Sequence, residues 1–305
     1  MSCIPLRVGA CTILEAFAAS HASAHGFAGP RFFPATLASD DPFVAEEFSL
    51  PTVAWSRDDD GTKTTAWSTD LAKRITPNLG IELGATYLHV SPPGGPSLNG
   101  FDNLALGLKY QIAVDPVHET IFSLGLDIDI GGTGAARVGA ESFTTFAPTF
   151  FFGKGFGDLA DRDSWLRGFA LTGTLGIAIP EVARTPDGSG GFEPHPDSLE
   201  IGLALEYSIS YFQSQVRNIG LSAPFDRMIP IVELALETPL DRGGGMTTGT
   251  VNPGLIWAGQ YIQLSGEAVI PVNGASGHHV GFIAQLHFFI DDLFPNSLGQ
   301  PIFGG

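Results

Sequence analysis

The sequence predicts an all-β protein: a transmembrane antiparallel up-and-down β-barrel of about 12 strands, preceded by a signal peptide. Three observations support this. Apolar residues alternate with small or polar ones, the alternating runs recur from residue 49 to residue 290, and turn-forming clusters separate them. Alternation with period two is typical of a strand whose two faces meet different surroundings. The run lengths fit the roughly 9–11 residues of a tilted membrane strand better than the ~5–6 of a soluble strand.

Composition narrows the class of protein. Charged residues make up 15% of the 305 residues, well below the ~25% of a typical soluble domain. The formal net charge is −17, with 32 acidic residues against 15 Lys and Arg. A nucleic-acid partner is excluded on this ground, because binding phosphates requires a basic surface.

The first 24 residues have the features of a signal peptide. They contain Arg7, a mostly apolar run, and the small-x-small site Ala22–Ala24. Both cysteines, Cys3 and Cys11, lie in this leader, so we expect an exported, cysteine-free mature chain with no metal and no cofactor. The later sequence has no apolar run of the ~18 residues that a spanning helix needs, so an exported membrane protein of this kind must be a barrel.

Residues 25–48 show no strand alternation, and the stretch 25–47 contains four phenylalanines and three prolines. The phenylalanines are Phe27, Phe32, Phe33 and Phe43. Aromatic side chains favour burial, and the bore of the barrel is one place that provides it. We therefore weigh two alternatives for this segment, a plug in the bore and a periplasmic extension.

Residues 49–290 form the predicted barrel. The expected strands are 50–57, 63–75, 80–90, 102–114, 120–130, 143–155, 166–179, 198–212, 228–237, 250–259, 261–272 and 279–290. The connections after odd-numbered strands are generally longer and richer in Gly and Pro, which suits the outer side of the membrane. An even strand count then leaves both termini on the periplasmic side, the usual plan of bacterial outer-membrane barrels.

In the runs whose two faces we compare, one face is apolar throughout. In the 120–130 run this face carries Phe122, Leu124, Leu126, Ile128 and Ile130. The corresponding faces of the other runs compared are likewise free of charge. Because Lys or Arg at the bilayer midplane costs about 2–4 kcal/mol, we expect this face to meet lipid. A secreted β-sandwich is the alternative, but its solvent face would favour many Lys and Glu, and Lys is scarce here.

The opposite faces carry small residues and a set of charged side chains that we predict to line the lumen. This set is Lys109, Asp127, Asp129, Glu200, Glu206, Glu233, Glu237 and Glu267. Carboxylates in a narrow bore favour cations over anions. The alternative is an internal polar network that fills the bore. Twelve strands lie between the packed barrels of about eight and the open ones of sixteen or more, so both interpretations stand.

Two further features concern the strand ends. Trp55, Trp67, Tyr87, Tyr211 and Trp257 lie near expected strand ends, where aromatic girdles occur. Phe288 and Phe289 end the last strand, where the barrel-assembly machinery would recognise an aromatic terminus during insertion. Residues 291–305 follow as a periplasmic C-terminal tail.

His89 and Ser91 lie two residues apart on one strand face near the outer rim. This His-x-Ser spacing resembles a barrel lipid A deacylase, in which the histidine activates the serine. Only these three positions match, and Pro92 and Pro93 replace the expected continuation. The sequence therefore predicts no enzyme, with a rim lipid hydrolase that uses His89 and Ser91 as the remote alternative.

The leader, the alternating strands of residues 49–290 and the small-residue interior together resemble bacterial outer-membrane transporter proteins of the phenol-degradation meta-pathway type. That group is loosely related to hydrophobic-compound channels such as the long-chain fatty-acid transporters. The resemblance implies passive transport of small hydrophobic or aromatic solutes, and a bore that an N-terminal segment blocks. Twelve strands instead of fourteen mean that the lateral exit of the fatty-acid transporters does not carry over.

The resulting expectation is a monomeric channel in the bacterial outer membrane with a narrow acidic lumen. Its expected partners are outer-membrane lipid, a small-molecule solute and, during insertion, the assembly machinery. The alternative is a structural or partner-binding barrel with a closed lumen.

Overall fold

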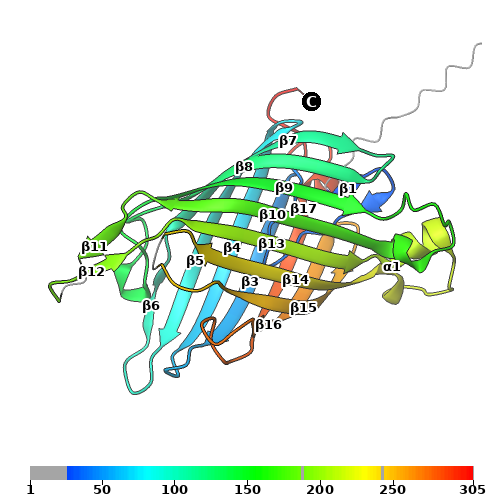
Figure 1. The fold of residues 1–305 in the computed structure, drawn as a ribbon. Helices are drawn as coiled ribbons and strands as arrows, with labels where there is room; N and C mark the ends of the chain where they lie inside the picture. Colours follow the sequence, from blue (N-terminus) through cyan, green and yellow to red (C-terminus); the bar gives the residue numbers. More distant parts are fainter. Residues whose placement is uncertain (1–25, 187–188, 242–243, 305) are drawn as a thin grey trace, which may run out of the picture.

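The computed structural model describes residues 26–186, 189–241 and 244–304. Twelve strands of this described part pair antiparallel in chain order, and the last pairs with the first, which closes the sheet into a barrel (Figure 1). The wall strands are β3 (Glu47–Arg57), β4 (Lys63–Thr76), β5 (Leu79–Ser91), β7 (Leu104–Asp115), β8 (Thr120–Ile130), β9 (Thr145–Gly155), β10 (Phe169–Pro180), β13 (Ser198–Tyr207), β14 (Met228–Pro239), β15 (Thr248–Ala258), β16 (Ile262–Pro271) and β17 (Gly281–Phe289). The predicted twelve-stranded up-and-down barrel is confirmed.

Short elements occupy the two ends of the barrel. The short strands are β1 (Phe27–Ala28), which pairs with β2 (Arg31–Phe32), β6 (Leu98–Phe101), which pairs with β5, and β11 (Arg184–Pro186), which pairs with β12 (Phe192–Pro194). The helical turns are η1 (Ala136–Val138), η2 (Trp165–Gly168), α1 (Ile209–Tyr211), η3 (Phe212–Val216), η4 (Phe225–Arg227) and α2 (Ile290–Leu293). None of the helices in the described residues combines the length and the apolar character needed to cross a bilayer.

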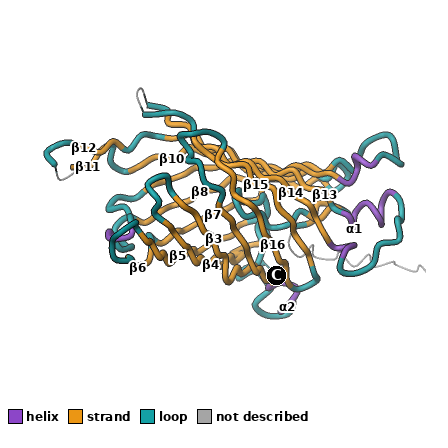
Figure 2. Tube along the Cα trace, turned by 90° about the horizontal axis from the view of Figure 1, so that it is seen from below, coloured by secondary structure: helices purple, strands orange, loops and turns teal. Residues whose placement is uncertain are grey.

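The two ends of the barrel differ. The hairpin of β11 and β12 lies at the end opposite α1, and the last described residues lie at the α1 end (Figures 1 and 2). By the plan of bacterial barrels, we call the end with β6, β11 and β12 the outer end and the other the periplasmic end. The expected signal peptide, residues 1–24, lies outside the described residues.

The outer face of the wall is apolar, as the alternation predicted. Leu83, Leu124 and Leu175 are each about half exposed in the isolated chain, at 50%, 51% and 49%. Aromatic side chains also pair across neighbouring strands on this face, for example Trp55 with Phe282 at 6.0 Å between ring centroids. This uncharged band has the character expected of a surface that meets acyl chains.

The expected eighth strand ends earlier than its alternating pattern. β13 stops at Tyr207, and the Ser208 side chain caps the turn of α1 by accepting a hydrogen bond from the Tyr211 amide at 3.2 Å. The sequence pattern placed Tyr211 in an aromatic girdle, and this prediction is wrong. Tyr211 is 4% exposed and turned toward the chain interior, where its hydroxyl donates to Glu119.

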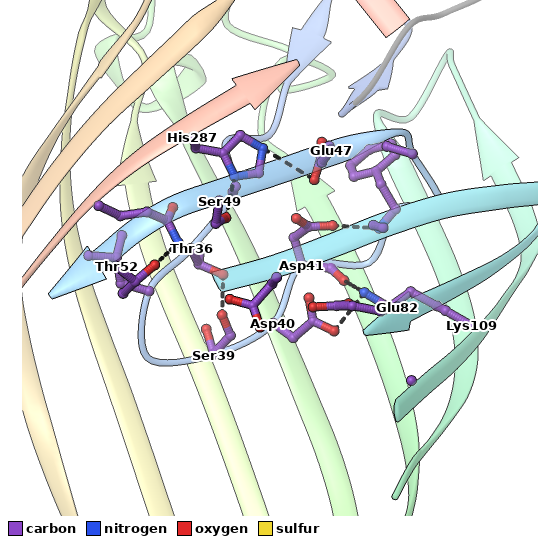
Figure 3. Close-up of a pocket in the computed structure, with 18 of the residues that line it drawn as sticks. Thr36, Ser39, Asp40, Asp41, Glu47, Ser49, Thr52, Glu82, Lys109 and His287 are labelled. Carbon is purple, nitrogen blue, oxygen red and sulfur yellow. Dashed lines mark hydrogen bonds and ion pairs between the residues drawn. The ribbon is translucent and has the colours of Figure 1, made fainter. Parts of the chain in front are cut away.

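Residues 26–46, called the N-terminal segment below, start at the periplasmic end, and the part from Ala35 to Asp41 lies inside the barrel (Figure 3). Phe33 and Phe43 are buried against Ile121 of β8. Wall glycines make room for the segment: a Cβ atom at Gly80 would come within 2.7 Å of the Val44 side chain. The small residues of the inner face thus accommodate a second layer of chain.

The C-terminal tail follows β17 and packs across the periplasmic end of β4. Its backbone amides at Ile302 and Phe303 donate to the carbonyls of Arg74 and Ile75, at 3.1 and 2.8 Å. The Lys73 ammonium also donates to the Leu298 carbonyl at 2.7 Å. The tail, for which the sequence suggested no role, therefore covers part of the barrel base.

Candidate functional site

The tip of the N-terminal segment is bound to the wall by one carboxylate. Glu233 of β14 accepts hydrogen bonds from the backbone amides of Leu37 at 2.7 Å, Ala38 at 2.9 Å and Ser39 at 2.8 Å. The Ser39 hydroxyl adds a fourth at 3.0 Å. Consecutive amides converging on an anion form a nest, in which the backbone dipoles compensate the charge. Glu233 itself is fully buried beneath the segment.

Other wall residues satisfy the polar backbone of the same segment. Lys109 of β7 contacts the Asp40 carboxylate at 2.6 Å and donates to the Asp41 carbonyl at 2.8 Å (Figure 3). Gln263 of β16 donates to the Ala35 carbonyl at 2.7 Å. Since a buried backbone group without a partner is costly, these contacts allow irregular chain to lie inside the barrel.

A second anchor holds the segment at the periplasmic end. Arg31 is fully buried and lies 3.2 Å from the Glu119 carboxylate, while its guanidinium stacks 3.5 Å above the Tyr211 ring. Glu119 also accepts from the Tyr211 hydroxyl at 2.5 Å. Burial, together with this hydrogen bond, raises the pKa of Tyr211 to about 12.

Two cavities flank the tip of the segment. The first, about 410 Å³, lies between the tip and the wall of β3, β4, β5, β7 and β17 (Figure 3). The second, about 430 Å³, faces β8, β9, β10, β13, β14 and β15. Ala38, Ser39 and Asp40 line both cavities, so the tip divides the lumen between them.

The first cavity is polar on both sides. One side carries Asp40, Asp41 and Glu82 around the Lys109 ammonium. The opposite wall carries hydrogen-bonded side chains of neighbouring strands, which are Ser49, Thr52, Ser68, Thr86, Gln285 and His287. Such a lining provides charge and hydrogen bonds beside apolar side chains such as Leu37, Phe43 and Val44.

The predicted lumen residues fall into two groups. Lys109, Asp127, Asp129, Glu200 and Glu237 line cavities, with Asp129 in a third cavity of about 280 Å³ toward the outer end. Glu206, Glu233 and Glu267 are instead buried, at 1%, 0% and 5% exposure. Within the described residues neither carboxylate oxygen of Glu206 has a hydrogen-bond partner.

Several charged residues of the lumen were not singled out from the sequence. Asp40 and Asp41 lie in a segment with no strand pattern, and Asp70 lies on a strand whose faces were not compared. Burial raises the pKa of Asp41 to about 7, although the neighbouring Lys109 ammonium acts to lower it. Arg31 was also not singled out. A signal was present, because Arg31 is a lone cation among aromatic residues in a chain with few cations.

The predicted phenylalanines of the N-terminal segment divide similarly. Phe33 and Phe43 are buried and lie 5.7 Å apart between ring centroids. Phe27 and Phe32 pair with each other at 5.2 Å, and Phe32 also meets Phe289 at the end of the last strand. Phe43 and Val44 line both the first cavity and a fourth of about 190 Å³, so these two residues separate the two spaces.

We predict that Glu233→Gln loosens the tip of the segment. The amide nitrogen of glutamine donates where the carboxylate accepts, so roughly 1.5–3 kcal/mol of charge-assisted hydrogen bonding is lost. Trypsin cleavage after the buried Arg31, detected as a new N-terminus at Phe32, should accelerate about 10-fold or more. Glu237→Gln, which lines the second cavity without holding the segment, is the matched control, and equal cleavage rates in the two variants would contradict the prediction.

Comparisons with known proteins bear on the fold. No protein-family model matches the chain, and no curated protein does. Among solved structures, an outer membrane channel from Pseudomonas putida F1 is similar, with 12% identity, a TM-score of 0.57, and coverage of 84% of this chain and 99% of that one. The NanC porin (8% identity, TM-score 0.46, 78% and 98% coverage) and the beta domain of the Bordetella autotransporter BrkA (14%, 0.45, 81% and 99%) also match. The likeness to the Pseudomonas channel shows that this chain has the fold of an outer-membrane β-barrel.

Proposed function

We propose that this protein is an outer-membrane channel for passive passage of small solutes, and that residues 26–46 act as a plug that restricts its lumen. The observation that carries the proposal is the binding of the segment tip by Glu233, which holds chain across the bore through hydrogen bonds. These are polar contacts that water can replace, so the tip can leave without breaking the barrel wall. Export by residues 1–24 and insertion by the assembly machinery belong to the same proposal.

The lining favours polar and cationic solutes. Asp127, Glu200 and Glu237 face the second cavity, and Asp40 and Glu82 face the first. A hydrophobic or aromatic solute of the kind implied by the family resemblance would displace water from these carboxylates without replacing their hydrogen bonds, which is unfavourable. We therefore infer a preference for small polar cations within the proposed channel.

Release of the segment would change the lumen further. The carboxylate of Glu206 has no hydrogen-bond partner among the described residues, and it would then meet water. Release also frees Glu233 from the amides that compensate its charge. The open lumen would consequently present more carboxylates than the closed one and would be more selective for cations.

A permanently closed barrel is the second candidate. The buried Arg31–Glu119 pair and the packing of Phe33 against Phe43 and Ile121 favour it, because both fix the base of the segment. In that case the protein would serve a structural or partner-binding role, and the cavities would hold only water.

Conductance of the purified protein in planar bilayers separates the two candidates. We predict small, fluctuating conductance for the full chain and a several-fold larger, steady conductance after deletion of residues 27–45, because the deletion empties the bore. An unchanged, sealed bilayer with the deletion variant would refute the channel, provided that the variant keeps the heat-resistant mobility of a folded barrel in gels.

The cation preference is predicted to depend on the cavity carboxylates. Replacing Glu200 and Glu237 together with Gln removes two negative charges from the second cavity and should lower the cation-to-anion permeability ratio about 2-fold or more. Reversal potentials in a salt gradient measure this ratio. Asp60→Asn, in an outer connection, is the control, and a ratio that stays the same in the double variant would rule out the proposed role of these two residues.

Seating of the segment should weaken as pH rises. Burial raises the pKa of Asp41 to about 7 in the seated segment, with Asp40 and Glu47 acting in the same direction and Lys109 against them. A released, solvated Asp41 would return to its usual pKa of about 3.9. Between these values the seated form holds an additional proton, so the stabilisation is complete below about pH 4 and is lost as pH passes 7.

The measurable consequence is an open probability that increases from pH 5 to pH 8. Asp41→Asn carries no titrating group and should flatten this part of the curve. A curve of the same slope in wild type and Asp41→Asn would show that other groups control the seating.

A further inference from the structure

A hydrogen-bonded relay stands at the outer end of β5, away from the lumen. His89 and Ser91 belong to β5, and Asn99 of β6 is the direct cross-strand partner of His89. The Asn99 side-chain oxygen lies 2.7 Å from His89 Nδ1, and Ser91 Oγ lies 3.1 Å from His89 Nε2. The channel proposal makes no use of these three residues.

The contacts fix the direction of the relay. An amide oxygen only accepts, so His89 Nδ1 carries a ring proton, and in the neutral imidazole Nε2 is then an acceptor. The Ser91 hydroxyl is then the donor to Nε2. Ser97 lies 3.0 Å from Ser91 Oγ and can donate to it in turn. A nucleophile, a base and a group that orients the base are therefore in the order that acyl transfer requires.

Strand register places this relay on the outside of the barrel. Trp67, Tyr87 and Phe101 form one cross-strand row and are 41%, 36% and 59% exposed, so this face points outward. His89 and Asn99 lie two residues further toward the outer end on the same face, because side chains repeat with period two. Aromatic rows of this kind mark the membrane–water interface. The relay thus stands at the outer edge of this interface, within reach of the acyl esters of outer-leaflet lipids.

Lys63 adds a positive charge to the relay. It is exposed and directly opposite Ser91 in the β4–β5 register, a position in which the two Cβ atoms are about 4.5–5.5 Å apart. An ammonium at this point can hold the anionic headgroup of a lipid or stabilise an oxyanion that forms beside Ser91.

We propose that Ser91, His89 and Asn99 form a hydrolytic site for the fatty acyl esters of outer-leaflet lipids. Ser91 and His89 are the catalytic residues, and Asn99 is a positioning residue that sets the histidine tautomer. The site is separate from the lumen, so it does not depend on whether the barrel conducts.

The steps balance with water as the only co-reactant. Ser91 Oγ forms a bond to the ester carbonyl carbon while His89 Nε2 takes the hydroxyl proton. The ester C–O bond then breaks, the alcohol leaves with that proton, and the acyl group stays on Ser91. Water, deprotonated by His89, attacks the acyl-serine, the fatty acid leaves, and the proton returns to Ser91 Oγ.

The test uses the full-length barrel in detergent micelles with two separate substrates, a glycerophospholipid and an acylated lipid A. We expect fatty acid release from at least one, and the arm that responds identifies the lipid. Ser91→Ala should lower the release about 10³-fold or more. Ser222→Ala, at the periplasmic end, is the matched control and should leave it unchanged.

The role of Asn99 is tested by the pH–rate profile, which would stay the same if Asn99 only supported the fold. Asn99→Leu should lower the rate about 10²-fold or more, because the histidine loses its orienting acceptor. Asn99→Asp should restore much of it and move the acid limb of the pH–rate profile to higher pH, since an added carboxylate stabilises the imidazolium. If the two substitutions acted only by disturbing the fold, both variants would lose the same activity and the acid limb would not move.

Covalent labelling provides a second, independent measurement. A fluorophosphonate probe should modify the wild-type chain at Ser91, as read by mass spectrometry of the peptide, and should leave Ser91→Ala unlabelled at that peptide. Release of fatty acid from neither lipid, with no adduct on Ser91 in a barrel of folded gel mobility, would overturn the proposal. Neither outcome affects the conductance experiment, so the two proposals fail or stand separately.

Discussion

The arrangement of the lumen depends on the carboxylate of Glu233. A buried charge without donors is strongly unfavourable, and so are three buried amides without an acceptor. Each requirement is met by the other, since the amides of residues 37–39 converge on this one side chain. The position of the tip follows from this contact. It brings Asp40 to Lys109 and divides the bore into two cavities.

The composition of the inner face is explained by the same chain segment. A twelve-stranded barrel is too wide to be filled by its own side chains if most of them are small, and too narrow to leave room for a folded domain. A single segment of chain without regular secondary structure fits into a bore of this width. Val44 beside Gly80 and Ser39 beside Gly202 show how the wall accommodates it, because at either glycine a Cβ atom would come within 2.7 Å of the segment. The acidic and small residues of the wall therefore serve a bound peptide as well as a solute.

The strands could be predicted because their pattern is local. In β8 the outward residues recur at every second position, and none of them is charged. This is the pattern expected of a face that meets lipid. The same pattern tells which side a residue faces but not what covers it, so buried Glu206 and cavity-lining Glu200 were not distinguished. It also cannot show where a cap interrupts the alternation, as at Ser208. Contacts such as Arg31 with Glu119 join residues 88 positions apart and depend on how the segment folds back.

Strand alternation also separates the two sites that we propose. On β5, Glu82 points inward to the first cavity, while His89 stands an odd number of residues further along and points outward beside Asn99. The wall between them is a single sheet that closes on itself through the pairing of β17 with β3. A change in the lumen, such as release of the N-terminal segment, alters the charge seen by a solute but leaves the β5–β6 register intact. Because that register alone brings Asn99 to His89, one strand can contribute to transport on its inner face and to lipid chemistry on its outer face without coupling the two.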